Sequence, residues 1–183
     1  MIIWLNGPFG AGKTTLSEKL SALLPGSLVV DPEEVGFALR RLVPAPPTGD
    51  FQDLPIWRSL TRFTLTEIRR LYGSTLIVPM TLVVPAYLTE IVGGLVDGGE
   101  DVLHVWLDVD DPILRSRITA QVIDPTDPVH DAEVRRWRLD QVDRCRAART
   151  HLPEGTRFLD SGVTDPDTLA AEITGWVTAG RHH

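Results

Sequence analysis

Cysteine is nearly absent from this sequence of 183 residues, which contains only Cys145. A single cysteine cannot form a disulfide within the chain, and it excludes metal sites that are built from several cysteines. Because a chain with so few cysteines suits a reducing compartment, we expect a cytoplasmic location. Cys145 itself is expected to be a buried helix residue and not a nucleophile.

Lysine is also scarce, since Lys13 and Lys19 are the only two lysines against 16 arginines. The formal net charge is −7, whereas nucleic-acid-binding proteins usually have a basic excess, so no nucleic-acid partner is expected. No apolar run approaches the roughly 20 residues that cross a membrane, and the short apolar start lacks the charged segment of a signal peptide. We therefore expect one globular domain over residues 1–183 that does not span a membrane.

Residues 7–14 read Gly-Pro-Phe-Gly-Ala-Gly-Lys-Thr and match the pattern G-x-x-x-x-G-K-[ST] at every fixed position. An apolar strand precedes this phosphate loop (P-loop) and a helical leucine pattern follows it, which is the context that the pattern requires. Glycines let successive backbone N–H groups turn toward phosphate oxygens, and the positive end of the helix dipole favours the same charge. A glycine-rich surface turn that binds nothing is the alternative.

The motif predicts a site for Mg²⁺ and ATP. We expect Lys13 to reach the β- and γ-phosphates and the Thr14 hydroxyl to hold the metal ion. The nucleotide-binding residues are expected to be Gly7, Pro8, Phe9, Gly10, Ala11, Gly12, Lys13, Thr14 and Thr15.

Short apolar segments alternate with helical patterns along the rest of the chain. We expect strands over residues 1–5, 27–31, 75–79, 102–109 and 156–160, the first three of them buried. We expect helices from near residue 12, from 32, over 54–72, after 85, after 111, over 131–149 and after 165. This alternation predicts a three-layer α/β fold with a five-stranded parallel sheet and the ligand at the strands' carboxyl ends. The expected strand order, 2-3-1-4-5, is an analogy with small P-loop kinases.

Signatures of other P-loop classes are missing. The sequence has no Asn-Lys-x-Asp element of guanine-specific GTPases, no Leu-Ser-Gly-Gly signature of transporter ATPases, and no room for a second helicase motor domain. A small-molecule kinase layout remains, with an acceptor-binding insertion at about 32–72 and an arginine-bearing lid at about 119–138.

Eight of the 16 arginines lie within residues 115–149. Because phosphoryl transfer needs cations that close on the transferring group, we expect catalytic arginines here and favour Arg117 and Arg138. The alternative is an ordinary solvated helix surface, since Asp131 and Arg135 have the i, i+4 spacing of a charge pair.

Asp31 is the most prominent acid, because it ends a predicted strand at the edge where phosphates should lie. It could accept the proton of an attacking hydroxyl or hold Mg²⁺ through water. It could instead only cap the helix that begins at Pro32, and both roles are compatible. The third strand ends Val78-Pro79-Met80-Thr81, without the acid that often assists Mg²⁺ at this place, so Asp31 or Asp108 would have to supply it.

A mixture of aromatic, acidic and basic residues follows the second strand and suits a sugar or nucleoside ligand. The alternative is that Trp57 belongs to the core and Asp53 caps a helix. His104 lies inside the fourth predicted strand and is expected to be a hydrogen-bonded core residue. The predicted acceptor-binding residues are Asp31, Phe37, Arg40, Phe51, Asp53, Trp57 and Met80.

Five segments between residue 1 and about residue 160 resemble the tunicamycin-resistance proteins. They are residues 2–10 together with 12–14, 31–36 (Asp-Pro-Glu-Glu-Val-Gly), 50–53 (Asp-Phe-Gln-Asp), 78–81 (Val-Pro-Met-Thr) and 141–145 (Gln-Val-Asp-Arg-Cys). The resemblance implies an ATP-binding protein that protects its host from tunicamycin, a lipid-tailed, uridine-containing antibiotic. More distantly, the layout is similar to chloramphenicol phosphotransferase and to shikimate and gluconate kinases, where an acid after the second strand meets the acceptor hydroxyl, which supports Asp31 by analogy.

Three functions stay open at this point. The protein could transfer phosphate from Mg·ATP to a hydroxyl of a nucleoside- or sugar-like molecule, with Lys13, Asp31, Arg117 and Arg138 as catalytic residues. It could bind a tunicamycin-like antibiotic in the presence of ATP without modifying it, which the missing acid after strand three favours. It could also be a housekeeping kinase. The sequence leaves open the acceptor, the oligomeric state (a homodimer included) and any peripheral association with membranes.

Overall fold

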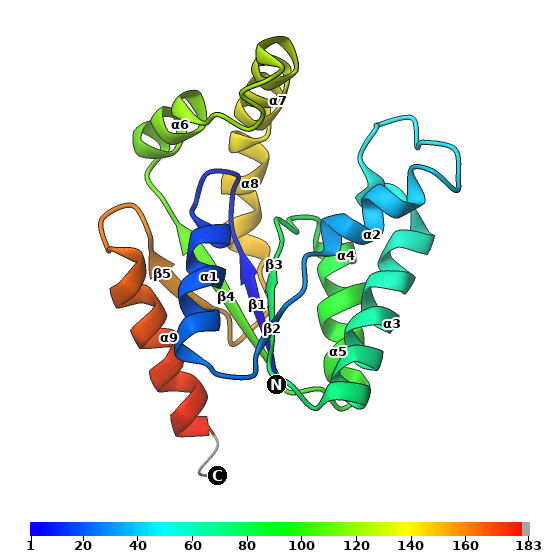
Figure 1. Cartoon of the computed structure of the whole chain (residues 1–183), viewed down its shortest axis with the longest axis vertical. Helices are drawn as coiled ribbons and strands as arrows, with labels where there is room; N and C mark the ends of the chain where they lie inside the picture. Colours follow the sequence, from blue (N-terminus) through cyan, green and yellow to red (C-terminus); the bar gives the residue numbers. More distant parts are fainter. Residues whose placement is uncertain (181–183) are drawn as a thin grey trace.

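A five-stranded parallel sheet forms the centre of the structure, a computed structural model that describes residues 1–180 (Figure 1). Its order is β2-β3-β1-β4-β5, which confirms the predicted fold class and strand order. The inner strands are mainly apolar because helices cover both faces of the sheet. The strands are β1 (Ile2–Asn6), β2 (Leu28–Val29), β3 (Leu76–Pro79), β4 (Val102–Asp108) and β5 (Arg157–Asp160).

The prediction that residues 27–31 form a buried strand is wrong. β2 has only two residues, and Leu28 and Val29 are 37% and 45% exposed. β2 lies at the edge of the sheet and, among the described residues, pairs with β3 alone. An apolar run does not by itself distinguish an edge strand from a central one.

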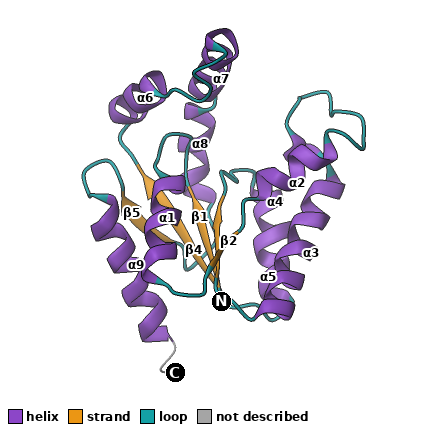
Figure 2. Cartoon of the chain, in the orientation of Figure 1, coloured by secondary structure: helices purple, strands orange, loops and turns teal. Residues whose placement is uncertain are grey.

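Helices lie on both sides of the sheet (Figure 2). The predicted helix over 131–149 is divided at Gln141 and begins earlier, at Pro128, because the Asp127 carboxylate accepts a hydrogen bond from the backbone N–H of His130. The α-helices are α1 (Lys13–Leu23), α2 (Pro32–Leu39), α3 (Pro55–Tyr72), α4 (Pro85–Leu88), α5 (Gly94–Asp97), α6 (Asp111–Ala120), α7 (Pro128–Asp140), α8 (Val142–Ala148) and α9 (Pro166–Gly180). Short helical segments are η1 (Phe51–Asp53), the π-helical η2 (Thr89–Gly93) and η3 (Arg149–His151).

The alternation of β1 side chains divides the core into two layers. Ile2 and Trp4 pack with α3, α4 and α5 on one face, and Ile3 and Leu5 pack with α1 and α9 on the other. Since neighbouring residues of a strand point to opposite faces, a single apolar strand serves both layers. Within residues 1–180, none of the helices is both long and apolar enough to cross a lipid bilayer.

All five strands run parallel, so their carboxyl ends meet at one edge of the sheet. The loop between β1 and α1 lies at this edge, with α6 and α7 beyond it on one side and α2 on the other (Figure 1). The segments that carry the predicted site residues are therefore gathered at one end of the molecule.

Candidate functional site

Residues 7–12 form the P-loop between β1 and α1, and two of its glycines have positions that no other residue would fit easily. Gly7 has a φ of 140°, and a Cβ there would lie 2.9 Å from the carbonyl oxygen of Leu107. Gly12 is the N-cap of α1 in the left-handed region, with a φ of 93°. This backbone path brings the free N–H groups of the first turn of α1 to the loop, which is how helix N-termini bind anions.

Buried polar side chains from three strand ends hold this loop. Asn6 Oδ1 accepts a hydrogen bond from the Gly7 N–H at 2.8 Å, and Thr81 Oγ1 donates to the Gly7 carbonyl at 2.8 Å. Ser161 Oγ donates to the Ala11 carbonyl at 2.8 Å. All three side chains are buried, so that water does not compete with these bonds. The loop is therefore held in its shape before any ligand binds.

His104 belongs to the support of the same loop. Asn6 Oδ1 accepts from two backbone N–H groups, those of Gly7 and Leu82, so its Nδ2 faces His104 Nε2 at 3.2 Å as a donor. His104 Nε2 is therefore the acceptor, and Nδ1 carries the proton that it shares with Thr156 Oγ1 at 2.8 Å. Burial lowers the pKa of His104 to about 4. The expected core histidine is confirmed, and it is neutral.

This buried histidine predicts a loss of stability in acid. Unfolded His104 has a pKa of about 6.5 and therefore binds a proton more readily than folded His104, so protons favour the unfolded state between pH 6.5 and 4. The contribution is complete above pH 6.5, and about 3 kcal/mol is lost as the pH falls to 4. Urea unfolding at several pH values measures this, and His104→Gln should flatten the pH dependence over this range. An equally steep dependence in His104→Gln would assign the effect to other groups.

A cavity of about 550 Å³ opens over the P-loop. Residues 9–15 form its floor, and all four residues that were predicted to be catalytic line it: Lys13, Asp31, Arg117 and Arg138. Gly7 and Pro8 do not line it; their carbonyl oxygens instead each accept a hydrogen bond from Lys13 Nζ at 2.9 Å. The cavity therefore combines backbone donors, cations and an acid, the groups that phosphoryl transfer requires.

Lys13 is partly buried at the floor of this cavity. Burial lowers the pKa of its ammonium group to about 8, and the nearby Glu33 carboxylate partly opposes this effect. We therefore expect ATP affinity to fall about tenfold between pH 7 and pH 9, because the neutral amine no longer attracts phosphate. Isothermal titration across this range measures the affinity. Lys13→Met should bind ATP weakly at both pH values, and a similar pH dependence in that variant would contradict the assignment.

Only two of the eight arginines between residues 115 and 149 line the cavity. Arg117 Nη2 donates to the Ser161 carbonyl at 2.9 Å, and Arg138 Nη1 donates to Gln121 Oε1 at 2.7 Å. Most of the others form ion pairs with aspartates, as the alternative interpretation predicts, although Asp131, the partner of Arg135, is buried and not on the surface. The arginines within 4.0 Å of an aspartate carboxylate are Arg115, Arg135, Arg144, Arg146 and Arg149. Contact of Arg117 and Arg138 with phosphate stays a prediction.

A family model described as AAA domain matches residues 2–142, which include the P-loop, Asp31 and both arginines that line the cavity. The chain belongs to the AAA domain family. This membership establishes a P-loop domain and implies nucleotide binding. No curated protein matches the chain.

This AAA-domain protein is similar in structure to several proteins over nearly its whole length. A tunicamycin resistance protein of Deinococcus radiodurans has 28% sequence identity and a TM-score of 0.69, covering 97% of this chain and 95% of that one. The predicted resemblance is thereby confirmed. A sugar kinase from Janibacter sp. HTCC2649 (18% identity, TM-score 0.60, coverage 97% and 94%) shares the fold. A shikimate kinase from Bacteroides thetaiotaomicron also shares the fold, with 17% sequence identity and a TM-score of 0.60, covering 97% of this chain and 98% of that one.

Two acids line the cavity, and the sequence had indicated one of them. Asp31 Oδ1 accepts a hydrogen bond from the Glu33 N–H at 2.9 Å, so Asp31 caps α2 and faces the cavity at once. The sequence analysis did not include Glu33 among the site residues. Its position in the first turn of α2, two residues after Asp31, could have indicated that it faces the same cavity. Loss of water around each group raises the pKa of both carboxyls, and the charge of Asp31 raises that of Glu33 further.

Asp108 is not available as an alternative acid for Mg²⁺. Both of its carboxylate oxygens accept hydrogen bonds from Arg149 Nε, at 3.0 and 2.8 Å, and Trp106 Nε1 donates to it at 2.8 Å. It lines a separate cavity. Thr14 and Asp31 share the P-loop cavity and fit a nucleotide-borne Mg²⁺, which needs only one or two protein ligands. No cluster of three or more metal-binding side chains occurs within residues 1–180.

The predicted acceptor residues other than Asp31 lie outside the cavity lining. Trp57 is completely buried, and its indole N–H donates to the Pro32 carbonyl at 3.0 Å. It is therefore a core residue, as the alternative interpretation predicted. Met80 is also buried in the core. Asp53 accepts hydrogen bonds from Thr48 and from Tyr87 and is not the N-cap of α3, which is Leu54.

Phe37, Arg40 and Phe51 form a separate group beside α2. The Arg40 guanidinium lies 5.4 Å from the Phe37 ring centroid and 5.5 Å from that of Phe51. Phe37 is 41% exposed, whereas Phe51 is nearly buried. The group therefore offers a ligand one aromatic edge and one cation, and its role in acceptor binding stays a prediction.

Proposed function

We propose that this protein is a phosphotransferase that binds Mg·ATP over residues 7–15 and transfers the γ-phosphoryl group to a hydroxyl of a nucleoside- or sugar-like molecule. One observation carries the proposal: Lys13, Asp31, Glu33, Arg117 and Arg138 line a single cavity over the P-loop. Because ATP is abundant in the cytoplasm, we place the activity there.

The chain's own residues account for each requirement of the transfer. Lys13 holds negative charge on the β- and γ-phosphates, and Arg117 and Arg138 stabilise charge on the transferring group. An acceptor hydroxyl gives its proton to Asp31 or Glu33 as its oxygen bonds to the γ-phosphorus, and the bond to the β-phosphate oxygen breaks to leave ADP. The Thr14 hydroxyl and Asp31 would hold Mg²⁺, which supplies further charge neutralisation when bound.

Two segments complete the proposed site. We assign acceptor binding to residues 32–72, which contain α2, η1 and α3, because Glu33 and Asp31 reach the cavity from the start of this region. We assign the lid to residues 119–138, which reach from the end of α6 to near the end of α7 and include Arg138. Closure of this lid segment would exclude water, so that ATP is not hydrolysed.

Antibiotic sequestration is the second candidate. The similarity to a tunicamycin resistance protein favours a tunicamycin-like ligand, and β3 ends in Pro79, followed by Met80 and Thr81, without an acid that would assist Mg²⁺. In this case ATP-loaded protein would lower the concentration of free antibiotic without changing it. Protection would then require protein in excess of drug, whereas an enzyme would protect in catalytic amounts.

Mass spectrometry of tunicamycin after incubation with the protein, Mg²⁺ and ATP tests the proposal. A mass gain of one phosphate supports phosphotransfer to this antibiotic. Unchanged drug that nevertheless binds in an ATP-dependent manner supports sequestration. If the drug is neither changed nor bound, the acceptor is another molecule. It can then be sought by measuring ATP-dependent shifts of the melting temperature with a panel of nucleosides and sugars.

A further inference from the structure

The ring of Phe9 connects the P-loop with helix α7 of the lid segment. Its centroid lies 5.0 Å from the ring of Trp137, with the planes at 62° in an edge arrangement. Arg138 Cζ and Lys13 Nζ each lie 5.6 Å from the same ring. Trp137 and Arg138 are neighbours on α7, so one aromatic side chain of the loop contacts two consecutive residues of the lid.

The P-loop motif does not explain this aromatic residue. Phe9 occupies one of the free positions of G-x-x-x-x-G-K-[ST], where the phosphate is bound by backbone N–H groups and any side chain satisfies the pattern. The ring lines the ligand cavity, next to Lys13. Its contacts with α7 are the structural reason for an aromatic ring at this position.

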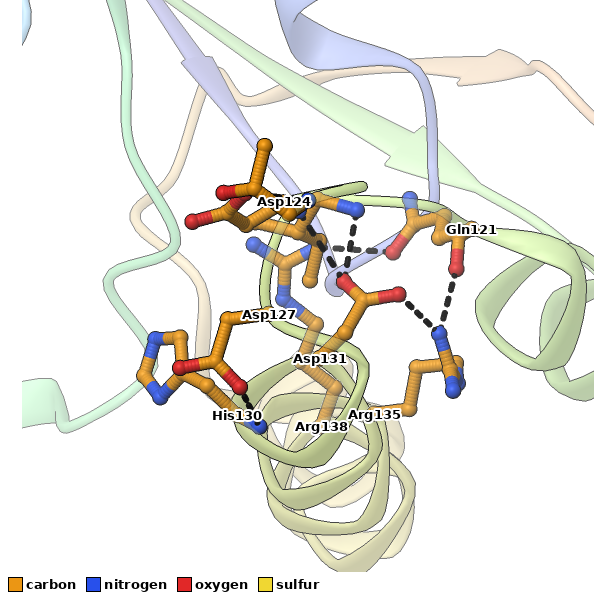
Figure 3. A network of polar contacts seen from close by, with 9 residues as sticks. Gln121, Asp124, Asp127, His130, Asp131, Arg135 and Arg138 are labelled. Atoms are coloured by element: carbon orange, nitrogen blue, oxygen red, sulfur yellow. Dashed lines mark hydrogen bonds and ion pairs between the residues drawn. The ribbon is translucent and has the colours of Figure 1, made fainter.

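Hydrogen bonds join the lid segment into one unit, as Figure 3 shows. Arg138 Nη1 donates to Gln121 Oε1 at 2.7 Å, and Arg135 Nη1 donates to the Gln121 carbonyl at 2.9 Å and to Asp131. Asp131 is only 4% exposed, and its Oδ1 accepts from the backbone N–H of Ile123 at 2.7 Å. The end of α6, the connecting loop and α7 are therefore tied together, and the position of one fixes the others.

Arg138 retains a donor that no group in the described part of the chain accepts. Its Nε is buried without a hydrogen-bond partner, while Nη1 is held by Gln121. A buried charged donor without a partner is costly, and an anionic oxygen in the cavity would relieve that cost. The orientation of Arg138 over the Phe9 ring is thus suited to a phosphoryl group above the loop.

We propose that Phe9 is a positioning residue, whose ring is the surface on which the lid segment docks so that Arg138 faces the transferring phosphoryl group. This inference rests on the proposed phosphotransfer for its kinetic consequence, although the docking itself does not require it. Phe9 acts through Arg138, whereas ATP is still held by Lys13 and the backbone of the loop.

Kinetics of Phe9→Leu and Phe9→Tyr test this role. Phe9→Leu keeps an apolar side chain but removes the ring, and we expect kcat to fall about 10²-fold, with KM for ATP unchanged within a few-fold, because a misplaced Arg138 no longer stabilises the transferring group. Phe9→Tyr keeps the ring and should retain most of the activity. The same substitution at Phe158, an exposed residue of β5 that does not line the cavity, is the matched control and should have no effect. A raised KM with unchanged kcat in Phe9→Leu would overturn the proposal.

The double variant distinguishes action through Arg138 from general damage to the loop. Arg138→Ala combined with Phe9→Leu should be no slower than Arg138→Ala alone, whereas multiplied losses would show that Phe9 acts independently.

Hydrogen exchange over residues 128–140 tests docking without any acceptor. Phe9→Leu should exchange faster in this segment than the wild type and Phe9→Tyr, and equal protection would refute docking even if phosphotransfer is real. Faster exchange in a protein that phosphorylates nothing would uphold docking and reject only the proposed function.

Discussion

Lys13→Ala is expected to abolish phosphoryl transfer, with a loss of about 10³-fold or more. The Lys13 ammonium is partly buried at the floor of the cavity and lies 2.9 Å from each of two loop carbonyls, which places its charge at the P-loop, where the β- and γ-phosphates are expected. The melting temperature should change by less than about 4 °C, because the two carbonyl bonds of Lys13 are largely offset by the desolvation of its charge. Turnover and melting temperature of the purified variant measure both quantities.

Lys19→Ala is the matched control, because Lys19 is the only other lysine and also lies on α1. Lys19 is exposed and pairs with Asp167 at 2.8 Å, away from the cavity. This control should transfer phosphate at the wild-type rate. If Lys13→Ala also kept its rate, the P-loop would not be the catalytic nucleotide site.

Asp31→Asn is expected to lower kcat by about 10²- to 10⁴-fold while the fold stays intact. The asparagine oxygen can still accept the hydrogen bond of the Glu33 N–H, so the cap of α2 is preserved, whereas the negative charge that takes the hydroxyl proton is lost. Measurement of kcat together with the urea-unfolding midpoint therefore separates the chemical role of Asp31 from its capping role.

Asp165→Asn provides a control for this separation. The Asp165 carboxylate accepts a hydrogen bond from the Thr168 N–H at 2.9 Å at the start of α9, but Asp165 does not line the cavity. Its variant should resemble the wild type in kcat. An Asp31→Asn protein that transfers phosphate at full rate would exclude Asp31 as the base and transfer the role to Glu33, which Glu33→Gln then tests.

Much of the site could be predicted because its parts are local in the chain. The P-loop, its preceding strand and its following helix occupy residues 1–24, and the cap by Asp31 follows from the neighbouring Pro32. Strand order followed only by analogy, and the structure confirms it. The choice of Arg117 and Arg138 among eight clustered arginines matches the two that line the cavity, and their contact with phosphate remains to be measured.

Contacts between segments that are distant in the chain could not be predicted from the sequence. The support of the P-loop by Asn6, Thr81 and Ser161 joins three strand ends, and the tautomer of His104 is set by the Asn6 amide, 98 residues away. The acceptor residues were predicted from their residue types and from their position after the second strand. In the structure, however, Trp57 and Met80 pack in the core. An aromatic residue is suitable both for a core and for a ligand, and only its neighbours decide.

Residues close together in the chain were enough to predict the phosphate loop, the parallel α/β fold and the acid between β2 and α2, because each of these features is specified locally. The tertiary structure alone decided that β2 is an exposed edge, that Glu33 joins the cavity, that Asp108 is bound by Arg149, and that Phe9 contacts α7. Burial and charge pairing depend on residues that are distant in the chain and become neighbours only in the folded structure. Local sequence patterns carry no information about these neighbours.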